Sequence, residues 1–119
     1  MSQTNGAPKP MKPAEFHILL VLSGRDLHGL GIAQAIDEAS DGVIRLGPGT
    51  LYRTLKEMQD HGLIEQSSRR PAPDLDDERR RYYRLTKFGK LVAAAEAQRM
   101  ASLVSVAQAG DLLSDSERA

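Results

Sequence analysis

Residues 47–63 read GPGTLYRTLKEMQDHGL and carry the strongest structural signal in the chain. Pro48 suits the first turn of a helix, because its missing N–H would have no partner there. Gly62, followed by Leu63, can end that helix with a positive φ. The stretch therefore predicts a helix over 48–61. One face is apolar and the other polar: Leu51, Leu55 and Met58 against Tyr52, Arg53, Lys56 and Gln59.

The flanking sequence predicts further helices and strands. Apolar periodicity favours helices over 14–23, over 29–39 and from 87 to about 108, with Thr86 as the cap of the last one. Short β-compatible runs cover 43–46, 63–68 and 81–85, and residues 69–80 form a long loop. The expected fold class is mainly α with a small β wing, a winged helix-turn-helix with a long C-terminal helix added.

This order divides the chain into four segments. Residues 1–13 form a disordered arm, because Gly6 and three prolines block regular structure. A winged-helix domain covers 14–86, the long helix covers 87–110, and residues 111–119 are a polar tail.

Composition limits the class of protein. The 119 residues suit one domain, and 40% apolar with 27% charged residues is typical of a globular chain. The absence of Cys excludes disulfides, thiolate catalysis and zinc–cysteine sites. The longest apolar stretch, 16–22, is too short to cross a membrane, and the first residues lack the apolar core of a signal peptide. We expect a cytoplasmic protein with no membrane partner.

Charge is unevenly placed. The formal net charge is zero, yet residues 69–90 hold eight basic and four acidic residues. A local basic patch is what phosphate binding requires, because counterion release depends on the charges in contact. Charge alone favours the alternative, a solvated charged hairpin.

Several short motifs resemble one known family. In order and spacing they are His28-Gly29-Leu30-Gly31-Ile32, Gly49-Thr50-Leu51-Tyr52, Leu55, Gly62-Leu63-Ile64, Tyr82-Tyr83-Arg84-Leu85-Thr86 and Gly89. Over residues 14–90 the chain is similar to the PadR family of transcriptional regulators. Two residues depart from the family pattern, Leu30 at a usually aromatic position and Arg53 where proline is common.

The resemblance implies a homodimeric DNA-binding regulator, usually a repressor, with 14–86 as the DNA-binding domain and 87–110 as the dimerisation helix. Helix 48–61 would enter the major groove of operator DNA, and the wing would contact the backbone or the minor groove. Some members bind small molecules near the dimer interface and leave DNA, so a small-molecule effector is a further expected partner.

The candidate DNA-binding residues lie on the helix and on the wing. Arg53 and Lys56 are three residues apart and so share a helix face, in the half that reads bases in helix-turn-helix proteins. The alternative is an exposed polar face with salt bridges. Strand residues alternate between faces, so about half of the wing arginines would touch phosphate. For the same reason, one of Tyr82 and Tyr83 would be in the core, and the other would either support the wing, which we favour, or form a hydrogen bond with phosphate. The full set is Thr50, Tyr52, Arg53, Lys56, Arg69, Arg70, Arg80 and Arg81.

The last helix carries a broad apolar face that a small core cannot cover along its whole length. We expect a dimer interface there, and the alternative is that the helix folds back on its own core. The interface residues, with one from the first helix, are Phe16, Leu91, Val92, Ala95, Met100, Leu103, Val104 and Ala107.

Nothing in the sequence indicates catalysis. The three histidines (His17, His28 and His61) have no metal-ligand spacing, and no Ser, His and acid arrangement is present. We expect no enzyme, no cofactor and no metal site. A second hypothesis for function is a winged helix that binds another protein through its polar helix face, without specific DNA binding.

Overall fold

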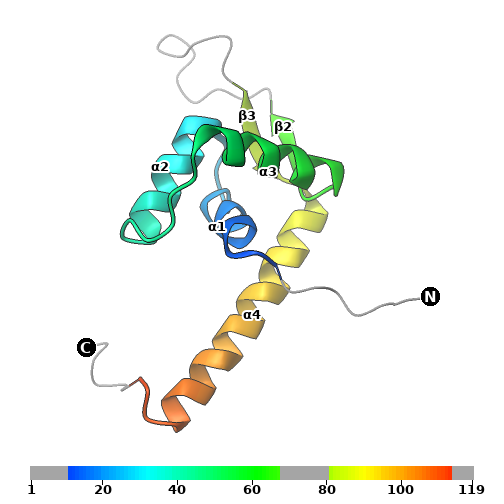
Figure 1. Ribbon diagram of the computed structural model, residues 1–119. Helices are drawn as coiled ribbons and strands as arrows, with labels where there is room; N and C mark the ends of the chain where they lie inside the picture. Colours follow the sequence, from blue (N-terminus) through cyan, green and yellow to red (C-terminus); the bar gives the residue numbers. More distant parts are fainter. Residues whose placement is uncertain (1–10, 68–80, 114–119) are drawn as a thin grey trace, which may run out of the picture.

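The computed structural model describes residues 11–67 and 81–113. In these residues the chain forms four helices and three short strands (Figure 1). They are α1 (Pro13–Val21), β1 (Leu27–His28), α2 (Gly29–Ala39), α3 (Pro48–Asp60), β2 (Ile64–Ser67), β3 (Tyr82–Leu85) and α4 (Lys87–Ala109). The expected class, mainly α with a small β wing, is confirmed.

The core forms around α1, which lies between α2, α3 and α4 (Figure 1). Ile18 and Leu19 of α1 are completely buried. They pack in one cluster with the apolar face of α3 and with Ile32 and Ile36 of α2. The inward face predicted for α3 is therefore confirmed, and this packing leaves its opposite face outside.

The first helix starts earlier than predicted. Pro13, which the sequence placed in a disordered arm, is the first helical residue, and Lys12 is the N-cap. The Lys12 backbone N–H donates to Glu15 Oε1 at 3.1 Å, which supports the first turn. Met11 packs against the core.

The three strands form an antiparallel sheet in the order β1-β3-β2. In β2 and β3, Ile64 pairs with Leu85 and Ser67 pairs with Tyr82. The prediction of a strand at 43–46 is wrong. These residues form no strand, and the third strand of the sheet is β1. The hydroxyl of Ser40 explains why 43–46 needs no strand partner. It accepts the Ile44 N–H at 2.9 Å and donates to the Ile36 carbonyl at 2.8 Å.

Of the two wing tyrosines, one lies in the core and the other supports the wing, as predicted. Tyr82 is 8% exposed and Tyr83 is 5% exposed. Tyr83 joins the core, whereas the ring of Tyr82 packs edge-on against His28 with ring centroids 5.4 Å apart. Strand β1 lies along the edge of β3, and its His28 side chain packs on Tyr82.

The start of α4 is fixed by Thr86, which caps the helix as predicted. Its Oγ1 accepts the Gly89 N–H at 2.9 Å and donates to the Gly62 carbonyl oxygen at 2.6 Å. One hydroxyl thus joins the first turn of α4 to the end of α3.

Replacing Thr86 with alanine is expected to lower the free energy of unfolding by about 1 kcal/mol, because the cap hydrogen bond is lost. Urea denaturation measures the change. Thr86→Ser keeps the hydroxyl and should stay near wild type. Equal stability of the alanine variant and wild type would show that the cap contributes nothing.

Candidate nucleic-acid interface

Helix α3 presents its predicted outer face to solvent. Thr50, Tyr52, Arg53 and Lys56 are all exposed. Thr54 is 9% exposed, and its hydroxyl donates to the Thr50 carbonyl at 2.8 Å. The sequence interpretation of α3 as a helix with one buried and one free face therefore holds, and the free face is the surface that the site is built on.

The first turn of α3 is open and carries no acidic residue. Gly47 and Gly49 are exposed, and a Cβ at either position would meet no atom within 4 Å. The unpaired N–H groups of a helix start attract anions, and neither glycine has a side chain that could cover them.

The two candidate cations of α3 differ in their surroundings. Lys56 Nζ lies 3.7 Å from Asp60 Oδ2 in an exposed pair, which contributes little to stability. Arg53 has no ion-pair partner within the described part of the chain. The alternative interpretation, a polar face with salt bridges, thus fits the second half of α3, and Arg53 in the first half is available to an outside ligand.

Tyr52 is half exposed, and its hydroxyl end lies against the start of α2. A Cβ built on Gly29 would be 2.5 Å from the Tyr52 hydroxyl oxygen. Burial raises the pKa of Tyr83 above its ordinary value, Tyr52 raises it further, and Arg81 lowers it. The side chain of Tyr52 therefore lies against α2 and interacts electrostatically with Tyr83 of β3.

The wing is described only at its base. Arg81 is exposed and its Nη1 donates to Gln66 Oε1 at 3.3 Å. Arg84 pairs with Glu65 at 2.9 Å. The other candidate arginines of the wing, Arg69, Arg70 and Arg80, lie outside the described residues. Ser67 donates a hydrogen bond to the Asp26 carboxylate, which joins the end of β2 to the residues before β1 and was not predicted from the sequence.

The first half of α4 packs on its own domain. This half fits the alternative in which the helix folds back on its own core. Val92 is half-buried against the core, and Ala93 packs beside it. Leu91 and Ala95 are four residues apart on one side of the helix, and both are exposed. The single broad face expected for the helix is therefore divided into two. Phe16, expected in the same interface, is half-buried on α1.

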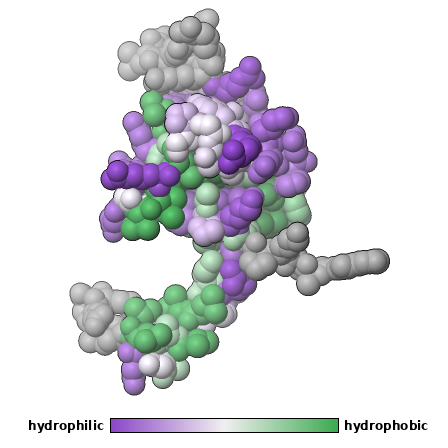
Figure 2. Space-filling model, in the orientation of Figure 1, coloured by the Kyte–Doolittle hydropathy of each residue, from purple (hydrophilic) through white to green (hydrophobic). Residues whose placement is uncertain are grey.

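The second half of α4 leaves the body of the domain, and its apolar side chains are uncovered. Leu103 is 52% exposed and Val104 is 44% exposed. Figure 2 shows hydrophobic surface gathered over this end of α4, at the bottom of the view. The exposed apolar surface also includes residues that the sequence analysis did not name: Val106, Leu112 and Leu113.

A carboxylate lies between these two halves. Glu96 is 8% exposed, and its Oε2 lies 2.7 Å from Nη2 of Arg99. The hydrogen bond from Arg99 lowers the pKa of Glu96, burial opposes this, and the charge of Arg99 lowers it further. A lowered pKa in the folded state means that the pair stabilises the fold above the ordinary carboxyl pKa. That stability is lost as the pH falls through the folded-state value.

Glu96→Gln is expected to flatten the loss of stability on the acid side, because the variant has no carboxylate to protonate there. The urea midpoint from about pH 3 to about pH 6 measures this for variant and wild type. If the urea midpoints of the two proteins fall equally with decreasing pH, protonation of Glu96 does not change the stability of the fold.

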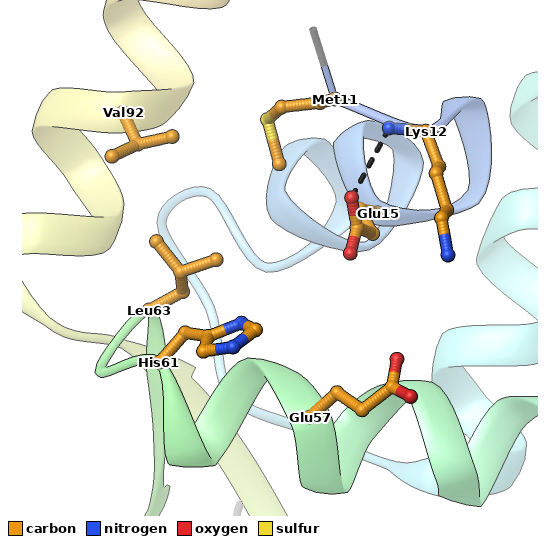
Figure 3. A pocket seen from close by; sticks show the side chains of 7 residues that line it. All are labelled: Met11, Lys12, Glu15, Glu57, His61, Leu63 and Val92. Atoms are coloured by element: carbon orange, nitrogen blue, oxygen red, sulfur yellow. Dashed lines mark hydrogen bonds between the residues drawn. The ribbon is translucent and has the colours of Figure 1, made fainter. Parts of the chain in front are cut away.

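A hollow of about 480 Å³ lies between α1, the end of α3 and α4 (Figure 3). Its lining residues are Met11, Lys12, Glu15, Glu57, His61, Leu63 and Val92. Figure 3 shows the apolar side chains at one end and the two carboxylates at the other. The size is within the range of small-molecule sites.

Within residues 11–67 and 81–113, no cluster of three potential ligands could hold a metal ion. In the same ranges no helix combines the length and the apolar character needed to cross a membrane.

Comparison with known proteins gives the family and the fold. A sequence model described as the transcriptional regulator PadR-like family matches residues 18–95. A PadR family transcription regulator from Clostridium difficile is 26% identical, over 80% of this chain and 94% of that chain, with a TM-score of 0.64. A search of curated proteins finds no match.

Two further solved structures share the fold. A transcriptional regulator from Clostridium thermocellum, Cth-833, is 22% identical over 80% of this chain and 86% of that chain, with a TM-score of 0.63. Bacillus subtilis PadR, solved in complex with operator DNA, is 21% identical over 71% of this chain and 46% of that chain, with a TM-score of 0.59.

Proposed function

The chain belongs to the PadR-like family of transcriptional regulators, and from this we propose that it is a dimeric repressor that inserts α3 into the major groove of operator DNA. Members of the family regulate transcription and are not enzymes. The DNA-bound Bacillus subtilis relative has the same fold, which supports DNA as the partner.

The observation that carries the proposal is the free first half of α3. It combines an open helix start, an arginine (Arg53) that has no ion-pair partner among the described residues, and a second cation one turn later. Arginine suits guanine edges and phosphates, whereas lysine makes a less directional phosphate contact. In the proposed complex Arg53 reads bases, Thr50 and Lys56 contact phosphate, and the ring of Tyr52 borders the groove. On the wing, Arg81 contacts phosphate together with Arg69, Arg70 and Arg80.

Dimerisation is proposed through the second half of α4. Its stripe of Met100, Leu103 and Ala107 follows the four-and-three spacing that helices use to pack along each other. A contiguous exposed apolar surface of this kind often marks an interaction site. Val104 borders this stripe, and Phe16, Leu91, Val92 and Ala95 would contact the partner nearer the domains.

Release by a small molecule is the last part of the proposal. The hollow beside Met11 and Val92 is large enough for such an effector and lies at the end of α3 far from Arg53. A ligand there would touch α1, α3 and α4 together, and so could change the angle between the DNA-binding helix and the dimer helix.

Arg53→Ala is expected to lower operator affinity roughly 10- to 100-fold and to relax sequence preference, because a base contact is removed. Lys56→Ala should weaken binding to all sequences alike and reduce the slope of log affinity against log salt by about 1. Fragments of genomic DNA selected by the purified protein supply the operator, and titration at several salt concentrations measures the changes.

Lys90→Ala serves as the matched control, since Lys90 is an exposed cation on α4. It should bind within about twofold of wild type. Wild-type affinity for both α3 variants would contradict the proposed reading face. Failure of the wild type to retain any DNA, together with a co-purifying protein, would favour the protein-binding alternative instead.

A further inference from the structure

The most unusual contact of the outer face of α3 is made by Tyr52. The phenol ring crosses from α3 to the first residue of α2. A methyl group on Gly29 would lie 2.5 Å from the Tyr52 hydroxyl oxygen, 2.8 Å from Cζ and 2.9 Å from Cε1. Gly29 is buried although it is a glycine at a helix start, and Tyr52 is the side chain nearest to it.

Gly29 follows directly on a tightly held segment. His28 pairs with Tyr82 of the wing in the sheet, and Leu27 pairs with Tyr83. Nδ1 of His28 accepts the Gly31 N–H at 3.1 Å and so caps α2. The ring of Tyr52 therefore rests on the point where the wing strand and α2 are joined.

The phenol of Tyr83 provides an independent sign of the same arrangement. Tyr83 is buried in β3, and Tyr52 is the side chain that raises its pKa after burial itself. The two phenols are thus electrostatic neighbours, although they come from α3 and from the wing. One side chain of α3 in this way lies against α2 and interacts electrostatically with the wing.

We propose that Tyr52 is a positioning residue that sets the angle of α3 relative to α2 and the wing, with Gly29 as its seat. The inference rests on the proposed DNA binding, and it assigns Tyr52 a role through the protein instead of a polar contact to DNA. Tyr52 lies between Leu51, which is in the core, and Arg53, which faces out. A shift of Tyr52 would therefore move Arg53 relative to the wing.

Gly29→Ala tests the contact between Gly29 and the Tyr52 ring without replacing any residue proposed to face DNA. The backbone at Gly29 has no positive φ, and alanine is the better helix former, so the fold itself should tolerate the change. The added methyl group displaces the Tyr52 ring, which can swing outward because it is half exposed. We expect operator affinity to fall at least 10-fold and the ratio of specific to non-specific binding to fall with it, while the melting temperature stays near wild type.

A double-mutant cycle identifies Tyr52 as the cause. In a Tyr52→Ala background the methyl group at position 29 has nothing to displace. Gly29→Ala should then change operator affinity less than twofold and raise the melting temperature. Additive losses in the double variant would overturn the proposal.

Tyr52→Phe separates positioning from a direct polar contact. Phenylalanine keeps the ring on Gly29 and should bind operator within threefold of wild type, whereas Tyr52→Ala should lose at least 10-fold. If Tyr52→Phe loses as much as Tyr52→Ala, the hydroxyl binds DNA directly and the positioning role is wrong. Failure of the wild type to bind any DNA is a different result, which contradicts the proposed function itself.

Discussion

Gly89→Ala is expected to lower the free energy of unfolding by about 3 kcal/mol, the upper end of the usual cost of overpacking. A Cβ on Gly89 would lie 2.0 Å from the carbonyl oxygen of Leu63 and 3.0 Å from its carbonyl carbon. Both are backbone atoms and cannot turn aside. The first turn of α4 would have to move away from the start of β2, and the hydrogen bond from the Thr86 N–H to the Leu63 carbonyl, 3.2 Å, would be strained.

Urea denaturation of Gly89→Ala measures this effect, with Gly49→Ala as the control. Gly49 also lies in the first turn of a helix, but a Cβ there meets nothing within 4 Å. The free energy of unfolding of Gly49→Ala should be between that of wild type and about 1 kcal/mol higher, because alanine is a better helix former than glycine. If Gly89→Ala is as stable as wild type, the close approach of α4 to Leu63 does not exist in the folded protein.

Leu103→Glu is expected to separate the dimer and to lower operator affinity by at least about 100-fold. Leu103 lies in the middle of the uncovered stripe of α4, and a carboxylate there would have to be buried without a partner. Two linked DNA-binding domains gain about 100-fold or more in affinity over one, and a monomer loses this gain. Sedimentation and operator titration measure the two effects separately.

Ser105→Glu adds the same charge on the opposite side of α4, where Ser105 is exposed. It should remain dimeric and bind operator like wild type. A dimer that persists in Leu103→Glu would show that the second half of α4 is not the interface. A wild-type chain that is monomeric at micromolar concentration would contradict the proposed assembly as a whole.

The sequence was most informative where several local signals agree. Helix α3 carries a proline at its start, a regular apolar face and a glycine after its end, and the predicted range differs from the observed one by a single residue. Helix α2 was predicted with its observed bounds. In both helices the residues that set the start, the apolar face and the end lie close together in the sequence. One sequence is therefore enough to predict these helices.

Features that depend on distant partners were missed. Strand β1 has two residues, too few for any periodicity, and exists because it pairs with Tyr82 and Tyr83 far along the chain. The packing of His28 of this strand against Tyr82 was missed for the same reason. The two sides of α4 could not be separated either, because apolar residues stand on both, and only the position of α1 determines which side is packed.

The sequence predicted which cations belong to the candidate site, but it did not predict which residues their neighbours contact. Arg53 and Lys56 were identified because they share a face, and the structure leaves that face free. Nothing local shows that Tyr52 reaches Gly29, since the two residues are in different helices. The ion pair of Lys56 with Asp60 lies four residues apart on one helix, a spacing that the sequence does display.

Hydroxyl-radical footprinting on a selected operator, combined with the mass of the complex in solution, tests the central claim most directly. The account predicts two chains per duplex and two protected segments whose centres lie about 34 Å apart, one turn of DNA. Arg53→Ala should weaken both protected segments equally. One chain per duplex with a single protected segment would contradict the account.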